Sequence, residues 1–207
     1  MTALVTLVLS ALVLPQVPAG QITLTPLQKA QDLFRQADSL PTSHEKLPLL
    51  EKAQGELTSG SEIDAEDAAT LYWQAVLLGE LLLHQSKFAA LKGLPKLERL
   101  LLKLIERDPA YAQAGGHRML ARIYQQAPGV ISIGSNAKAE KHFKAALALF
   151  PKNAGNQILY ADFLKQTGNP DLARDFARKG LAELGSGEPY ERRRWQEIGD
   201  AVLKQGS

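Results

Sequence analysis

The four histidines are the first residues to consider for chemistry, because an imidazole can act as a general base or as a metal ligand. His44, His84, His117 and His142 show no spacing typical of a metal site, such as HExxH. The chain contains no cysteine, which excludes thiol catalysis, thiolate metal sites, disulfides and acylation of an N-terminal cysteine. The sequence also has no GxSxG motif and no phosphate-binding loop. We therefore expect no enzymatic activity, no metal and no cofactor.

A group of charged and amide side chains is suited to binding instead. Arg118 and Arg122 lie one helical turn apart, so their two guanidinium groups could bind a carboxylate ligand or a peptide end. Glu80, Arg122 and Asp162 are expected side by side on the concave surface, on the neighbouring first helices of three successive repeat units. The alternative is a charge ladder that sets the packing register and binds nothing. The candidate ligand- or partner-binding residues are Glu80, Arg118, Arg122, Gln125, Asp162 and Lys165.

Apolar residues in two predicted interhelical loops form a second candidate surface. One loop follows the helix that carries Arg122 and spans residues 127–135, and the other spans residues 88–95 of the preceding unit. We expect both loops on the same side of the molecule, where they either pack against their own hairpins or form an exposed contact patch. The candidate patch consists of Phe88, Leu91, Pro128, Val130, Ile131 and Ile133.

The spacing of small and large apolar residues predicts the elements that position these side chains. Ala139, Phe143, Ala146 and Leu147 follow the i, i+4, i+7, i+8 pattern of a buried helix face, and Pro151 ends that helix. A matching pattern occurs earlier, over 97–109, and again later, over 173–181. The spacing between the central pattern and the later one equals the period of a tetratricopeptide repeat, about 34 residues. The sequence therefore predicts an all-α, tetratricopeptide-like α-solenoid of stacked helix hairpins.

Proline, glycine and cap residues set the expected helix boundaries. They predict helices over residues 25–40, 44–57, 63–85, 94–107, 155–166 and 170–184, besides those of the central unit. A capping helix over 188–204 is expected to close the array through Trp195, Ile198 and Val202. Residues 20–207 should form a single domain, and a net charge of +2 is too small to indicate nucleic-acid binding.

The N-terminus predicts export. Residues 2–14 form an apolar run that is too short to span a membrane, and a small residue, Ala19, precedes the expected cleavage point. We therefore interpret residues 1–19 as a signal peptide and expect the protein in the periplasm. No Lys or Arg precedes the apolar run, so an upstream start, an uncleaved anchor or a hydrophobic arm are the alternatives.

Residues 115–164 resemble the T component of TRAP transporters, which are tripartite ATP-independent uptake systems. The resemblance lies in GGHRxLARxY, APG, IGS and AxxHFxxAL, read between Gly115 and Leu147. It implies a helical periplasmic protein that partners a substrate-binding protein, tends to form trimers and holds a small apolar or carboxylated ligand. Members of this family are often lipoproteins, whereas a chain without cysteine cannot be one. The alternative function is a general envelope scaffold that gathers other proteins in its groove.

Overall fold

The computed structural model describes residues 24–59, 67–185 and 189–204, and within these ranges the regular structure is helical throughout, without a strand. None of the described helices is long and apolar enough to cross a membrane. The predicted signal peptide, residues 1–19, lies outside the described ranges. The helices are α1 (Pro26–Asp38), α2 (Ser43–Ser59), α3 (Ala68–Leu83), α4 (Lys87–Arg107), α5 (Tyr111–Gln126), α6 (Asn136–Leu149), α7 (Ala154–Gln166), α8 (Pro170–Ala182) and α9 (Pro189–Lys204).

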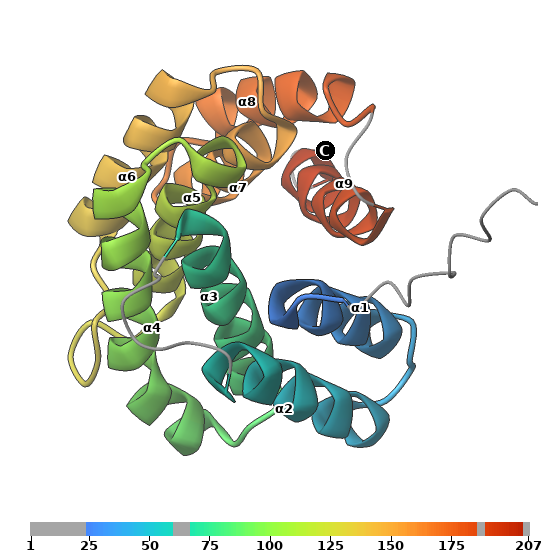
Figure 1. Ribbon diagram of the computed structural model, residues 1–207. Coiled ribbons are helices and arrows are strands. Elements are labelled where there is room, and N and C mark those ends of the chain that lie inside the picture. The colour runs from blue at the N-terminus through green and yellow to red at the C-terminus, as the bar shows by residue number, and fades with distance from the viewer. Residues whose placement is uncertain (1–23, 60–66, 186–188, 205–207) are drawn as a thin grey trace, which may run out of the picture.

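The first eight helices pair in sequence order into hairpins, and the hairpins stack into an arc (Figure 1). The small residues that predicted the repeat lie in the contacts between helices, since Ala121, Ala139 and Ala146 are all completely buried. Alanine at such positions lets two helices approach closely, and dispersion contacts then accumulate along their length. Phe143 fills the space between them and is also completely buried. The predicted all-α, tetratricopeptide-like solenoid is confirmed.

Side-chain caps fix where several of the helices begin, including α2, where the Thr42 hydroxyl accepts from the Glu45 backbone N–H. The side chains of Thr25, Asp67, Ser86, Ser135 and Asn153 each accept a hydrogen bond from the backbone N–H three residues further on. Each cap satisfies one amide that the helix itself leaves unpaired, and contributes about 1 kcal/mol. The caps also stop the chain from extending a helix backwards into the preceding loop.

The structure corrects the predicted loop at residues 88–95. Helix α4 already begins at Lys87 under the Ser86 cap, so Phe88 and Leu91 are helical. Gly93 and Pro95 both lie within this stretch. Gly93 is a point of close approach, because a Cβ atom there would overlap the Leu82 side chain of α3. Pro95 lies inside the helix, on its exposed side.

The start of α5 contains a left-handed turn formed by residues other than glycine. Ala112, Gln113 and Ala114 have φ values of 49°, 54° and 63°, a conformation that side chains with a Cβ atom disfavour. The buried guanidinium of Arg118 compensates, since it donates to the Gln113 carbonyl oxygen at 3.1 Å and to Asn156 Oδ1 at 3.0 Å. This bonding ties the turn to α7.

The last helix closes the array as predicted and also crosses its interior. Trp195 and Val202 of α9 are buried, and Ile198 packs beside them, which confirms the expected inner face. Figure 1 shows α9 inside the arc and facing α1. Two ion pairs join it to the first half of the chain: Arg193 with Asp38 at 3.8 Å and Arg194 with Glu80 at 3.3 Å. Arg193 and Arg194 therefore link α9 to α1 and α3.

Candidate functional site

The main candidate site is a cavity of about 530 Å³ on the inner side of the arc. Helices α3, α4 and α5 form its walls, and α9 contributes a further wall from the far end of the chain. Its volume lies in the usual range for small-molecule sites. Apolar side chains dominate the lining, which consists of Phe34, Tyr72, Val76, Gly79, Glu80, Leu82, Leu83, Lys87, Ala90, Leu91, Leu94, Leu97, Arg118, Met119, Arg122, Ile123, Gln126, Ala127, Pro128, Leu159, Arg194, Trp195 and Ile198.

Arg122, one of the predicted site residues, lines this cavity but is satisfied internally. Its Nη1 donates to Asp162 of α7 and, at 3.1 Å, to Gln125 Oε1. With the side-chain amide of Gln126 oriented so that its oxygen faces Arg122, that oxygen accepts from Nε at 3.0 Å and from Nη2 at 2.9 Å. Asp162 also accepts from the amides of Gln125 and Gln166. All three nitrogens of the guanidinium are thus engaged, as expected for a charge ladder.

The charge ladder lacks an ion pair between Glu80 and Arg122. Glu80 was expected beside Arg122, whereas its carboxylate pairs with Arg194 of α9. The physical reason is that α9 crosses the inner face and brings a cation of its own to α3. Local spacing along the repeats could not indicate this contact, because Glu80 and Arg194 are 114 residues apart.

Arg118 is also committed within the fold. It is 7% exposed, and besides its bonds to Gln113 and Asn156 its guanidinium lies 5.6 Å from the Trp195 ring. Asn156 is completely buried and donates in turn to the carbonyl oxygens of Ala146 and Phe150. The pair of arginines one turn apart therefore does not present two free guanidinium groups to the cavity.

Two other predicted binding residues lie away from the cavity lining. Gln125 belongs to the Arg122–Asp162 network, and Lys165 donates to the Ala201 carbonyl oxygen of α9 at 2.6 Å. Lys165 thereby holds the C-terminal part of α9 against α7. Asp162 is not part of the lining either, although it bonds to Arg122, which is.

The predicted apolar patch divides into two groups. Leu91 and Pro128 line the cavity, and Ile133 packs against the core. Phe88, Val130 and Ile131 are exposed, with Val130 at 99%. Residues 127–135 form the loop that was predicted, so self-packing and exposure both occur within it.

A histidine pair between α5 and α6 was missed by the sequence reasoning. The Nδ1 atoms of His117 and His142 lie 2.9 Å apart, and the His142 ring packs beside Tyr124. Burial, the neighbouring His117 and nearby lysines lower the pKa of His142 to about 4, and burial together with Lys141 lowers the pKa of His117. Burial and a 2.6 Å hydrogen bond to Glu98 raise the pKa of Tyr124. The common helix face of His117 and Tyr124 was the signal available in the sequence.

This pair is a packing contact within the hairpin and not part of a larger metal cluster. Among the described residues, no group of three or more His, Cys, Asp or Glu side chains is arranged to hold a metal ion. The two imidazoles share one proton between their Nδ1 atoms, so one ring must accept where the other donates. Burial disfavours the charged form of each ring and is the largest cause of both lowered pKa values, and for His142 the neighbouring His117 adds to it.

Comparison with known proteins identifies the family. A thermophilic tetratricopeptide-repeat protein of Thermus thermophilus is similar in structure, with 18% sequence identity, a TM-score of 0.45 and coverage of 82% of this chain and 98% of that one. No curated protein matches the chain. The family model described as TRAP transporter T-component matches residues 28–174, which is well over half of the sequence. The chain belongs to the TRAP transporter T-component family.

Proposed function

We propose that this protein holds a small, mainly apolar carboxylic acid in its inner cavity while serving a TRAP uptake system in the periplasm. The observation that carries the proposal is the cavity itself, which is large enough for such a molecule and lined mostly by aliphatic side chains. Family membership supports the association with a TRAP system. The protein acts by contact, as a carrier or docking element, and catalyses no reaction.

Lys87 is the cavity residue best suited to bind the carboxylate. The three arginines of the lining are each engaged: Arg118 with the left-handed turn, Arg122 with Asp162 and Arg194 with Glu80. Lys87 lies at the start of α4 and forms no ion pair with any residue that the structure describes. An ammonium group at the mouth of an apolar cavity suits a ligand with one anionic end and a hydrocarbon tail.

The test is isothermal titration of decanoate and of decanol into the purified full chain. We expect decanoate to bind, and Lys87→Gln to lower its affinity about tenfold while leaving decanol unaffected. Lys92→Gln, which removes the same charge from the outer side of the same helix, is the matched control and should change neither affinity. Absence of binding by both compounds, together with no retained small molecule in native mass spectrometry, would refute the ligand proposal.

We further propose that the docking partner is the periplasmic substrate-binding protein of the same uptake system. The general scaffold function is the weaker alternative, because α9 lies inside the arc where an extended peptide would otherwise bind (Figure 1). The partner proposal is tested by mixing the protein with a binding protein encoded beside a TRAP permease gene and following sedimentation. Two species that sediment independently at micromolar concentrations would contradict it.

A further inference from the structure

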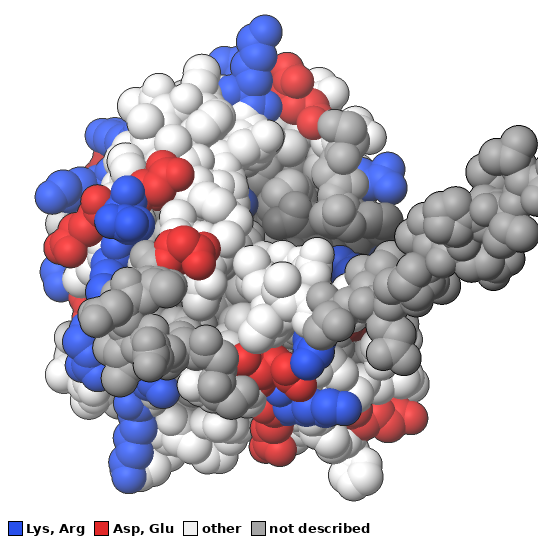
Figure 2. All heavy atoms as spheres, viewed as in Figure 1, with Lys and Arg blue, Asp and Glu red and all other residues white. Residues whose placement is uncertain are grey.

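The outer face of α4 carries an unusual row of positive charge. Lys92, Lys96, Arg99, Lys103 and Arg107 are all exposed and follow the spacing i, i+4, i+7, i+11, i+15, which places them on one side of the helix. We call these five residues the α4 basic face. At about 1.5 Å per residue the row is about 22 Å long. In Figure 2, Lys and Arg side chains project from the lower-left edge of the molecule, where α4 lies in Figure 1.

Most of these charges are not neutralised by the residues that the structure describes. Lys92, Lys96, Arg99 and Arg107 form no ion pair with any described residue, and Glu106 is the one acidic side chain of α4 that is exposed. The other outer helices differ. On α6, Lys144 pairs with Glu140, and on α8 two arginines pair with aspartates three residues before them. The row of positive charge on α4 lacks the paired carboxylates seen on α6 and α8, and such a field indicates a negatively charged partner.

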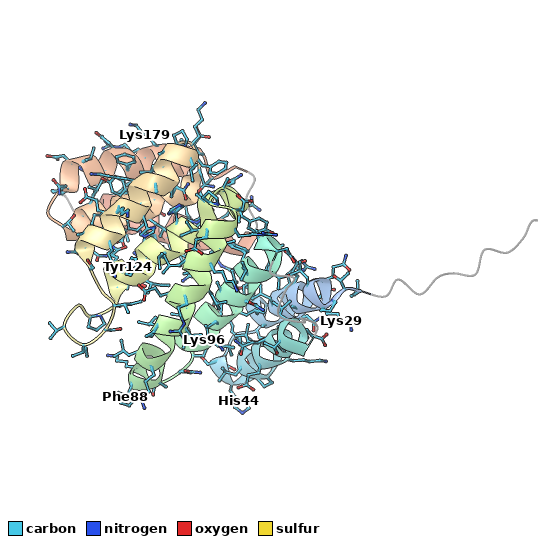
Figure 3. The ribbon with its side chains drawn as sticks, turned by 60° about the vertical axis from the view of Figure 1, so that its left-hand side comes forward. Lys29, His44, Phe88, Lys96, Tyr124 and Lys179 are labelled. Atoms are coloured by element: carbon cyan, nitrogen blue, oxygen red, sulfur yellow. The ribbon has the colours of Figure 1, made fainter. Side chains whose placement is uncertain are left out.

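Three exposed apolar side chains accompany the basic face. Phe88, Val130 and Ile131 are 69%, 99% and 72% exposed, and the ammonium of Lys92 lies 4.5 Å from the centre of the Phe88 ring. Phe88 belongs to the first turn of α4, and the other two lie in the 127–135 loop. Figures 1 and 3 both show this loop toward the end of the molecule where α4 begins, and Figure 3 labels Phe88 at that end. The cavity lining agrees, since it includes Leu91 and Pro128 from the same two segments.

We propose that the α4 basic face and these three apolar residues dock the protein on an anionic phospholipid bilayer. Lysine and arginine side chains at such a surface are attracted to lipid phosphates, and each contributes about a fivefold gain in affinity. Phe88, Val130 and Ile131 insert among the headgroups, where exposed apolar side chains leave water. Lysine is depleted in protein interfaces, so a row with three lysines among five cations suits lipid better than an acidic protein. The inference does not depend on the ligand in the cavity.

The test is sedimentation of the full chain with large vesicles, made either of phosphatidylcholine alone or of two parts phosphatidylcholine to one part phosphatidylglycerol. We expect binding that requires phosphatidylglycerol and weakens as salt increases. Lys92→Gln with Lys96→Gln should lower the affinity about 25-fold, because two charges are lost. The matched control is Arg178→Gln with Lys179→Gln on α8, which removes the same charge from exposed positions and should have no effect. The sample with phosphatidylcholine alone measures any vesicle binding that the apolar run at residues 2–14 contributes without anionic lipid.

A second pair of substitutions tests the apolar contribution. Val130→Asp with Ile131→Asp should abolish vesicle binding without changing the melting temperature, because both side chains are exposed in the folded protein. Equal effects of the α4 and α8 double variants would overturn the proposal. Binding to soluble poly-glutamate that depends on Lys92 and Lys96, without binding to vesicles, would also overturn it and assign the face to an acidic protein partner.

Discussion

Because of the left-handed turn at the start of α5, we expect Ala112→Gly to raise the free energy of unfolding, whereas an alanine-to-glycine change in a helix usually lowers it. Alanine in this conformation is strained by about 1–2 kcal/mol, and glycine removes that strain. Glycine also increases the entropy of the unfolded chain, which costs about 0.5–1 kcal/mol. With φ 49° and ψ 41° at Ala112, the balance is a gain in the free energy of unfolding of about 0.5–1 kcal/mol. Elsewhere in a helix the same change is destabilising by about 1 kcal/mol.

Ala145→Gly is the matched control, because Ala145 lies within the right-handed α6. Urea denaturation followed by circular dichroism should therefore give a higher midpoint for the Ala112 variant and a lower one for the Ala145 variant. Arg118→Met should lower the stability by about 3 kcal/mol, since the carbonyl oxygen of Gln113 and the side chain of Asn156 lose their donor. If Ala112→Gly destabilises as much as Ala145→Gly, the turn is not left-handed and the structural role given to Arg118 fails.

Three further predictions concern the core, the histidine pair and α9. Phe143→Ala should lower the free energy of unfolding by about 3–5 kcal/mol, measured by urea denaturation, because Phe143 is completely buried; a loss below about 1 kcal/mol would contradict its central position. Because the pKa of folded His142 is lowered to about 4, the unfolded chain binds more protons between pH 6.5 and 4. Stability should thus fall by about 2 kcal/mol as the pH decreases through that window, after allowance for partial exposure, and His142→Gln should flatten the profile. Trp195→Ala should weaken decanoate binding at least tenfold, because it opens the wall of the cavity that α9 provides. An unchanged affinity for decanoate in titration calorimetry would exclude that wall from the site.

The repeat could be predicted from sequence because its signal is local. Close helix contacts require alanine or glycine at fixed intervals, and Ala121, Ala139 and Ala146 satisfied that requirement in the sequence and in the structure. The closing helix followed from the same reasoning, since the apolar end of an array must be covered. The path of this helix across the inner face could not be predicted in this way, because the path depends on the accumulated curvature of all the preceding hairpins.

The errors have specific physical causes. Gly93 and Pro95 are ordinary helix-ending signals, and here a capped start at Ser86 and the close approach to Leu82 outweigh them. The left-handed turn at Ala112 carries no glycine, so nothing in the local sequence marks it. The compensating bonds come from Arg118 and Asn156, and the latter belongs to α7, a full hairpin further along the chain.

These long-range contacts also decide what kind of site the cavity is. From the sequence alone, Arg118 and Arg122 could either bind a carboxylate with two guanidinium groups or take part in a charge ladder. In the structure the fold uses each guanidinium to hold an element in place: the left-handed turn, the α5–α7 contact and α9. Lys87 is the cationic lining residue whose side chain forms no ion pair or hydrogen bond with another described residue, and most of the remaining lining is apolar. Since Arg194, Trp195 and Ile198 lie beyond the residues 28–174 that define family membership, the wall that completes the cavity belongs to the part of the chain outside that match.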